Sequence, residues 1–180
     1  MKNFVTSDLH FGHKNIIKYE NRPFQNIEEM DMTIIDIWNN TVSKEDTVYI
    51  LGDFSWYKGE KTNLVLKQLK GNKILIRGNH DENFLKDIKF DKSLFQEIYD
   101  YKEIKINKTK IIMCHYPIID WNGKNNGSIH LYGHVHTITN KDTEYMKTLE
   151  KEYNCMNVGI DVHKKLLNLE EIYEQRKIYN

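Results

Sequence analysis

The sequence has little cysteine, no excess of either charge and no long apolar run. Its two cysteines, Cys114 and Cys155, follow no pairing motif, which argues against a disulfide scaffold and favours free buried thiols. Lysine plus arginine and aspartate plus glutamate both number 26, so the formal net charge is zero. This balance argues against a broad positive surface for duplex DNA or an anionic membrane. A local basic rim around a small phosphate ligand is compatible with it.

The sequence also lacks segments that would direct the chain into or across a membrane. The first ten residues (MKNFVTSDLH) do not contain the apolar run of a signal peptide, and no later segment could span a bilayer. We therefore expect a cytoplasmic protein. Repeats, low-complexity tracts and linkers are missing, and 180 residues suffice for a sizeable core, so a single domain over residues 1–180 is predicted.

Strands and helices alternate in the first half of the chain. Strands are predicted at 3–7, 47–51 and 73–77, and amphipathic helices at 27–42 and 60–70. Strand–helix–strand units with long crossovers imply parallel pairing. The carboxyl ends of the strands then meet at one edge of the sheet, where open α/β sheets bind their ligands.

The second half of the chain is richer in consecutive strands. Its patterns predict strands within 98–106 and at 110–114, 129–132 and 156–160. An amphipathic helix is expected at 166–173. These elements predict a second, mixed sheet that faces the first one.

Polar side chains follow five of the predicted strands directly after the strand ends. They are Asp8 and His10, Asp53, Asn79 and His80, His115, and His134 and His136. Because side chains alternate along an extended strand, Asp8 and His10 should point the same way, and so should His134 and His136. The alternative is a set of unrelated polar turns, which the position of every group at a strand end disfavours.

Seven of these eight side chains suit a metal site. Carboxylate, imidazole and amide oxygen together favour first-row ions such as Mn, Fe or Zn over a thiolate site. Seven ligands exceed what one tetrahedral ion needs, whereas two ions that share a bridging aspartate would use them all. A two-metal site stabilises the attacking and leaving oxygens of phosphoryl transfer and makes a bridging water acidic enough to ionise near neutral pH.

The same blocks resemble the signature of the calcineurin-like metallophosphoesterases. That family carries D-x-H, G-D, G-N-H-D/E, an H and G-H-x-H in this order. The corresponding blocks here are Asp8-Leu9-His10, Gly52-Asp53, Gly78-Asn79-His80-Asp81, His115 and Gly133-His134-Val135-His136. As an ordered set between residues 8 and 136 they are highly specific, although no single block would be.

The resemblance implies a four-layer αββα sandwich, an α/β fold of two mixed sheets flanked by helices, with a dinuclear metal centre at the strand ends. It assigns the ligands in two groups: Asp8, His10 and His136 for the first ion, Asn79, His115 and His134 for the second, and Asp53 as the bridge. Manganese is the expected metal, with iron, zinc or nickel as alternatives.

His80 is the one member of the set that the resemblance leaves without a metal. A non-ligand imidazole beside the phosphate can donate a proton to the leaving oxygen or stabilise transition-state charge. In the phosphoprotein-phosphatase branch, the bridging block continues as G-D-x-x-D-R-G, and its second Asp supports the catalytic histidine. Here the block continues as Phe54-Ser55-Trp56-Tyr57, which argues against a protein phosphatase and leaves the group that orients His80 unassigned.

Four further residues are candidates for substrate contact: His13, Arg22, Trp56 and Lys124. His13 lies close to His10 in the sequence, Arg22 and Lys124 are cations that could bind phosphate, and Trp56 could stack on a nucleobase. Each has a structural alternative, because histidines and aromatics often pack in cores and cations are mostly solvated or structural.

These observations together predict a metal-dependent phosphoesterase with a small phosphodiester substrate, for instance a nucleotide. Hydrolysis of a phosphomonoester is the alternative within the same family. The alternative of another class is a non-catalytic metal-binding scaffold or interaction module, which the retention of all eight site residues disfavours. Binding of extended nucleic acid is not expected at zero net charge. The natural substrate and the oligomeric state stay open.

Overall fold

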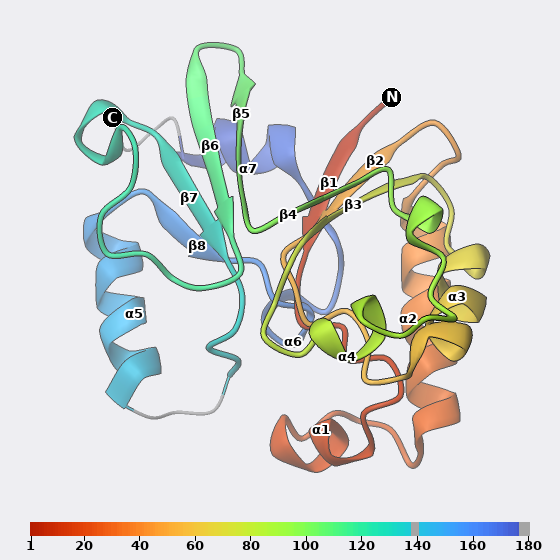
Figure 1. Cartoon of the computed structure of the whole chain (residues 1–180). Helices are drawn as coiled ribbons and strands as arrows, with labels where there is room; N and C mark the ends of the chain where they lie inside the picture. Colours follow the sequence, from red (N-terminus) through yellow and green to blue (C-terminus); the bar gives the residue numbers. More distant parts are fainter. Residues whose placement is uncertain (138–140, 177–180) are drawn as a thin grey trace.

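Two β-sheets packed face to face form the centre of the structure, a computed structural model that describes residues 1–137 and 141–176 (Figure 1). The first sheet has the strand order β4-β3-β2-β1-β9 and is parallel except for β9. Its strands are β1 (Asn3–Thr6), β2 (Thr47–Ile50), β3 (Asn72–Ile76), β4 (Glu97–Tyr99) and β9 (Leu167–Asn168). Parallel pairing brings the carboxyl ends of β1, β2 and β3 to the same edge.

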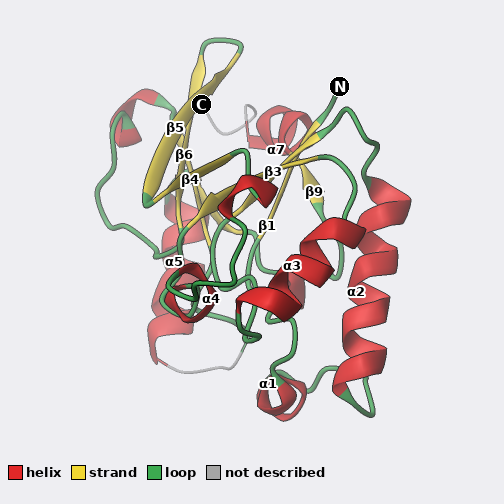
Figure 2. Ribbon diagram, turned by 45° about the vertical axis from the view of Figure 1, so that its right-hand side comes forward, coloured by secondary structure: helices red, strands yellow, loops and turns green. Residues whose placement is uncertain are grey.

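The outer face of the first sheet is covered by α2 (Ile27–Thr41) and α3 (Gly59–Gln68), as Figure 2 shows. Alternation along β2 determines which side chains meet these helices. Val48 and Ile50 belong to the apolar cluster that includes residues of both helices, whereas Tyr49 belongs to the cluster between the two sheets. A strand buried on both faces explains why β2 has so little polar character.

The second sheet has the strand order β5-β6-β7-β8, with one antiparallel pair and two parallel ones. Its strands are β5 (Tyr101–Ile106), β6 (Thr109–Cys114), β7 (Ile129–Tyr132) and β8 (Cys155–Asn157). The helix α5 (Lys141–Glu152) covers its outer face, where Met146 and Leu149 pack in one cluster with Ile112. The predicted αββα sandwich with two mixed sheets is therefore confirmed.

Several short elements were not predicted or differ from the prediction. The helix α1 (Lys14–Tyr19) is only six residues long, which is too short for a clear apolar period, and α5 consists mostly of charged residues. The remaining short pieces are α4 (Glu82–Leu85) and two 3₁₀ turns, Lys92–Leu94 and Lys124–Asn126. None of the helices within 1–137 and 141–176 combines the length and the apolar character that crossing a membrane requires.

The segment after β8 shows the clearest difference. The predicted strand 156–160 ends at Asn157, because the chain here crosses to the first sheet: the N–H of Ile160 donates to the carbonyl of Ser7 at 3.0 Å. A short helix, α6 (Ile160–His163), follows. The last helix, α7 (Leu169–Arg176), also begins later than the predicted residue 166, because β9 first pairs with β1.

His130, in β7, is fully buried and ties the loop after His115 to the second sheet. Its Nε2 accepts a hydrogen bond from the N–H of Ile118 at 3.0 Å, and the Ile112 carbonyl is 3.3 Å from Nδ1. Nε2 must be unprotonated to accept this bond. Burial lowers the pKa of His130 to about 4, so the folded protein keeps the imidazole neutral at neutral pH.

This lowered pKa predicts a pH-dependent stability. The unfolded chain protonates His130 near its ordinary pKa of 6.5 and the folded protein only near pH 4, so the free energy of unfolding should fall as the pH drops through this range, by up to about 3 kcal/mol. Urea unfolding of metal-stripped wild type and His130→Gln between about pH 7 and pH 4.5 measures the difference in slope. If the free energy of unfolding changed equally with pH in the two proteins, His130 would not be the group with the lowered pKa.

Candidate active site

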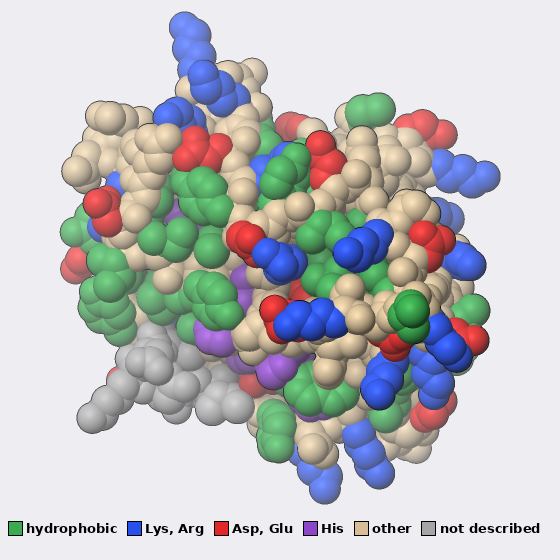
Figure 3. Space-filling view, in the orientation of Figure 1, with side chains coloured by type: hydrophobic (Ala, Val, Ile, Leu, Met, Phe, Trp, Pro, Cys, Tyr) green, Lys and Arg blue, Asp and Glu red, His purple; other side chains and the backbone are tan. Residues whose placement is uncertain are grey.

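Loops at one edge of both sheets carry the eight polar residues singled out from the sequence. In the first sheet, β1, β2 and β3 lead into the loops of Asp8, Asp53 and Asn79, and in the second sheet β6 and β7 lead into those of His115 and His134. Histidine side chains accordingly gather in one place on the face shown in Figure 3. The structure therefore brings together residues from five separate segments.

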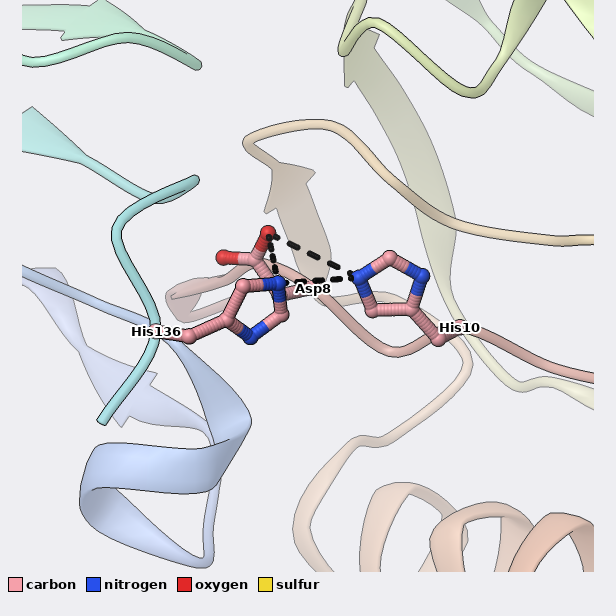
Figure 4. A group of neighbouring side chains, drawn as sticks. All are labelled: Asp8, His10 and His136. Carbon is pink, nitrogen blue, oxygen red and sulfur yellow. Dashed lines mark hydrogen bonds and ion pairs between the residues drawn. The ribbon is translucent and has the colours of Figure 1, made fainter. Parts of the chain in front are cut away.

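The first cluster consists of Asp8, His10 and His136 (Figure 4). The Nε2 atoms of the two histidines are 3.3 Å apart. The Oδ1 atom of Asp8 lies 4.0 Å from Nε2 of His10 and 3.9 Å from Nε2 of His136. Three potential ligand atoms thus surround one point.

The second cluster consists of Asp53, His115 and His134, whose potential ligand atoms all lie within 4.8 Å of one another. Asn79 joins it, because its Oδ1 is 3.0 Å from Nε2 of His115. An amide oxygen, two imidazoles and a carboxylate are therefore available at this second point.

Asp53 lies between the two clusters. Its Oδ2 is 3.7 Å from Nε2 of His10 in the first cluster, and its Oδ1 is 3.6 Å from Nε2 of His115 in the second. One oxygen thus faces each cluster. This is the position that a bridging carboxylate would occupy.

The backbone of the ligand-bearing loops is left-handed rather than extended. Asp8 and His10 have φ of 58° and 54°, Asp53 has 52°, and His134 and His136 have 71° and 35°. The prediction that period-two alternation makes the paired side chains converge was therefore wrong in its geometry, although the side chains do converge. Non-glycine residues pay about 1–3 kcal/mol each for such conformations, which persist where surrounding contacts enforce them.

Close approach of two loops allows Asp53 to reach this position. A Cβ on Gly52, where φ is 80°, would lie 2.6 Å from the Cα of Gly78, and a Cβ on Gly78 would overlap the carboxylate of Asp53. Only glycine leaves room at both positions. The G-D and G-N-H blocks therefore contribute spacing as well as potential ligands.

Asp81 holds these two loops together, a role that the sequence analysis did not assign. Its fully buried carboxylate accepts backbone hydrogen bonds from Gly78 at 2.7 Å, Asp53 at 3.1 Å and Phe54 at 2.8 Å. Burial raises the pKa of Asp81 to about 7, against the effect of these donors. Its place directly after Gly-Asn-His was the available signal, but nothing local to the sequence reveals a contact with residues 53 and 54.

Two histidines of the site favour the neutral form that can bind a metal, whereas Asp161 and the neighbouring carboxylates raise the pKa of His136 against the effect of burial. Burial lowers the pKa of His10 well below its ordinary value and lowers that of His134. In His115, Nδ1 is 2.8 Å from the Leu51 carbonyl, so an Nδ1–H donated there leaves the lone pair of Nε2 toward Asn79 and Asp53. Burial raises the pKa of Asp8, an effect that a cation bound beside it would oppose.

His80 lies at the rim of the site with 38% of its side chain exposed. Its Nε2 is 3.8 Å from Oδ2 of Asp53, and its backbone N–H donates to Oδ1 of the same residue at 3.0 Å. Asp81 does not contact the ring, since its carboxylate is occupied by backbone donors. His80 is thus positioned through Asp53 and is accessible to a substrate.

Aromatic side chains flank the site on two sides. Trp56, 37% exposed, is stacked on His13 with ring centroids 3.9 Å apart and an interplanar angle of 6°, and its centroid is 4.6 Å from that of His80. Tyr116, 44% exposed, lies 4.8 Å from the ring of His134. Both of the predicted substrate contacts His13 and Trp56 therefore adjoin the site.

Asp31 of α2 fixes the stacked pair, which the sequence analysis did not anticipate. Its Oδ1 accepts the N–H of Gly12 at 3.1 Å, and its Oδ2 accepts the hydroxyl of Tyr57 at 2.9 Å. Gly12 precedes His13 and Tyr57 follows Trp56, so one carboxylate anchors both loops.

The other two predicted substrate contacts lie elsewhere. Arg22 is buried, and its guanidinium donates to Asp161 and to backbone carbonyls rather than to open space. Lys124 donates to the Ile119 carbonyl and lies over the rings of Trp121 and Tyr153, 3.9 Å from the centroid of the latter. Neither geometry is that of a phosphate contact.

The donor set fits two divalent cations. Each cluster offers carboxylate oxygen and neutral imidazole nitrogen, which bind first-row metals only when deprotonated. The Nε2 atoms of His10 and His136 lie 3.3 Å apart beside buried carboxylates, and a cation between them would bind both the nitrogen lone pairs and the carboxylate oxygens.

The family model of the calcineurin-like phosphoesterase superfamily domain matches residues 1–160. The chain belongs to the calcineurin-like phosphoesterase superfamily. The predicted resemblance is thereby confirmed, and the matched region contains every residue of the two clusters.

Relatives of this calcineurin-like protein occur in archaea, phages and bacteria. An uncharacterized protein of Methanocaldococcus jannaschii, MJ1445, is 37% identical over 163 residues, which cover 89% of this chain and 82% of that protein. The gene 66 protein of Mycobacterium phage L5 is 28% identical over 197 residues, which cover 95% of this chain and 92% of that protein. The crystal structure of AQ665 from Aquifex aeolicus, a protein of unknown function, superposes with a TM-score of 0.72 at 28% identity and covers 97% of this chain and 98% of that one.

The close approach of Gly52 and Gly78 generates a test of the site's architecture. Gly78→Ala should displace Asp53 and strongly reduce the metal retained after dialysis, measured by plasma emission spectrometry. Gly71→Ala, at the other end of β3, is the matched control. Its added Cβ would lie 2.8 Å from the Asp46 carbonyl oxygen, so this variant should be less stable but should retain the metal. A folded Gly78→Ala protein with unchanged metal content would contradict the geometry.

Proposed function

We propose that this calcineurin-like protein is a metal-dependent phosphodiesterase that hydrolyses a small phosphodiester, for instance a nucleotide. The observation that carries the proposal is the position of Asp53, which directs one carboxylate oxygen into each of two ligand clusters. Two-metal centres of this kind serve in-line displacement at phosphorus. Manganese is the proposed metal, with iron, zinc or nickel as alternatives.

The proposed ligands are divided between the clusters. Asp8, His10 and His136 would hold one ion, Asn79, His115 and His134 the other, and Asp53 would contact both. When bound, the ions supply an ionised water near neutral pH and positive charge for the phosphate oxygens. The Leu51 carbonyl keeps His115 in the tautomer that binding requires.

His80 is the proposed general acid. It reaches the rim beside Asp53 and is partly exposed, so it can hold a proton at Nε2 for the departing oxygen. Asp53 fixes its backbone, and Trp56 lies against its ring. The backbone bond to Asp53 thus holds His80 in a chain that lacks the second aspartate of the phosphoprotein-phosphatase motif.

The rim favours a diester over a monoester. Around the clusters, the described side chains at the rim are the imidazole of His80 and the aromatic rings of Trp56 and Tyr116, whereas the cations Arg22 and Lys124 are engaged elsewhere. A singly charged diester with organic groups suits such a rim better than a doubly charged monoester. A small phosphorylated substrate is therefore the proposed partner.

We also propose a cytoplasmic location, which the free state of both cysteines supports.

A non-catalytic scaffold is the rival of another class. It would require no particular arrangement of the proton donor or of the bridging carboxylate. The convergence of all eight residues, with His80 left accessible, supports the enzyme instead.

Hydrolysis of paired model substrates tests the proposal. Metal-stripped protein should hydrolyse neither bis-p-nitrophenyl phosphate nor p-nitrophenyl phosphate, and added Mn²⁺ should restore activity with a preference for the diester. His115→Ala should remain inactive because a ligand is lost. His80→Ala should keep both ions and lower kcat by about 10²–10⁴-fold, most strongly for diesters with poor leaving groups.

Two results would revise the proposal. A preference for p-nitrophenyl phosphate would indicate a monoesterase. Wild-type protein that binds Mn²⁺ but hydrolyses neither compound would favour the scaffold.

The Trp56 platform predicts a binding effect on nucleotide substrates. Because stacking of a base on an aromatic ring contributes about 1–3 kcal/mol, Trp56→Ala should raise KM for a nucleoside phosphodiester about tenfold or more with little change in kcat. Tyr145→Ala removes an exposed ring from α5, on the outer face of the second sheet, and should leave KM unchanged. Equal KM values for all three proteins would remove Trp56 from the substrate site.

A further inference from the structure

A buried ion pair lies behind the first ligand cluster. Arg22, which follows α1, and Asp161, in α6, have side chains only 2% and 3% exposed. Two parallel hydrogen bonds join them, Nε to Oδ1 at 2.8 Å and Nη2 to Oδ2 at 2.7 Å. This bidentate geometry holds both planar groups in a fixed orientation.

The guanidinium of Arg22 also fixes the loop that carries Asp8 and His10. Its Nη2 donates to the carbonyl of Asp8 at 2.8 Å, and its Nη1 donates to the carbonyl of Leu9 at 2.9 Å. Asp8 and His10 have left-handed backbone conformations, which need external support. Arg22 supplies such support through these two carbonyls.

The carboxylate of Asp161 faces the third member of the same cluster. Its Oδ2 is 3.4 Å from Nδ1 of His136, whose other nitrogen, Nε2, faces His10. Among the described residues Nδ1 forms no hydrogen bond, but the carboxylate beside it favours a proton on Nδ1, which leaves the lone pair of Nε2 toward the cluster and makes that nitrogen a better ligand. Glu20 contributes from nearby by accepting the N–H of Thr137, the residue after His136, at 2.9 Å.

We propose that the Arg22–Asp161 pair is a positioning unit for one of the two metal ions. It connects the Asp8–His10 loop and His136, which together form the first cluster. In the second cluster, by contrast, His115 is oriented by the Leu51 carbonyl and Asp53 is held by Asp81. The inference rests on the proposed two-metal function and adds that the two ions depend on different supports.

A separate cation site in the same region is the alternative to a positioning role, and the experiment below distinguishes the two. Glu20, His136 and Asp161 offer three atoms within 4.8 Å of one another, an arrangement that could hold a cation of its own. The guanidinium of Arg22, 2.7 Å from Asp161, opposes a cation there. A positioning role predicts two bound ions in the wild type, and a separate cation site predicts three.

Titration of metal-stripped protein with Mn²⁺ alone tests the inference. Calorimetry gives the number and affinity of the ions, and electron paramagnetic resonance reports whether two of them are close enough to couple. Asp161→Asn should lower the affinity for one ion about 10–100-fold and leave the affinity for the other unchanged. The signal from coupled ions should then be lost at limiting metal. Asp46→Asn removes a buried carboxylate from the opposite end of β2 and should titrate like wild type.

Because Asp161→Asn leaves a buried guanidinium without its anion, the double variant Arg22→Met/Asp161→Asn provides a second measurement. It should show the same selective loss of one ion. Unchanged binding of both ions, or equal weakening of both ions in the Asp161 and Asp46 variants, would overturn the inference. Three ions in the wild type and two in Asp161→Asn would replace it with a separate cation site. A wild type that binds no ion would instead refute the proposed function.

Discussion

Compensation of buried negative charge is the constraint on which the site depends. Asp8, Asp53 and Asp81 are at most 2% exposed and lie in adjoining loops. Backbone N–H groups and the hydroxyl of Ser7 satisfy part of their hydrogen-bonding capacity. Asp8 and Asp53 face His10 and His134, whose pKa values burial lowers, so a bound cation would balance the charge that remains. The burial of the carboxylates, the types of potential ligand and the membership in a phosphoesterase superfamily are therefore all consistent with a cation-binding site.

The fold meets this constraint by placing the edges of two sheets beside each other. The first sheet supplies the aspartates and Asn79, and the second supplies His115, His134 and His136. Since neither sheet alone forms a complete cluster, packing of the apolar layer between them is also what assembles the site. The strained loop conformations are held from outside by buried polar groups, Asp81 behind one pair of loops and Arg22 with Asp161 behind another.

Much of the architecture could be read from the sequence because the main strands are strongly patterned. The strands β1, β2, β3, β6 and β7 end within about one residue of the predicted positions. Predictions failed where tertiary contacts decide: β8 stops early because Ile160 binds the end of β1, and α7 starts late because β9 pairs with β1. The short helix α1 and the mostly charged helix α5 were not predicted.

The sequence by itself determined which polar residues converge, since side chains placed directly after strands must meet at one edge of parallel sheets. The family resemblance divided the same residues into two groups. Only the tertiary structure decided how they meet, through left-handed loops rather than extended strand ends, and which residues support them. Asp81, Asp31 and Asp161 act through contacts with residues far away in the chain, and a local pattern carries no information about such contacts. For the same reason Arg22, a candidate phosphate ligand by its charge, lies beneath the site and is paired with a carboxylate 139 residues away.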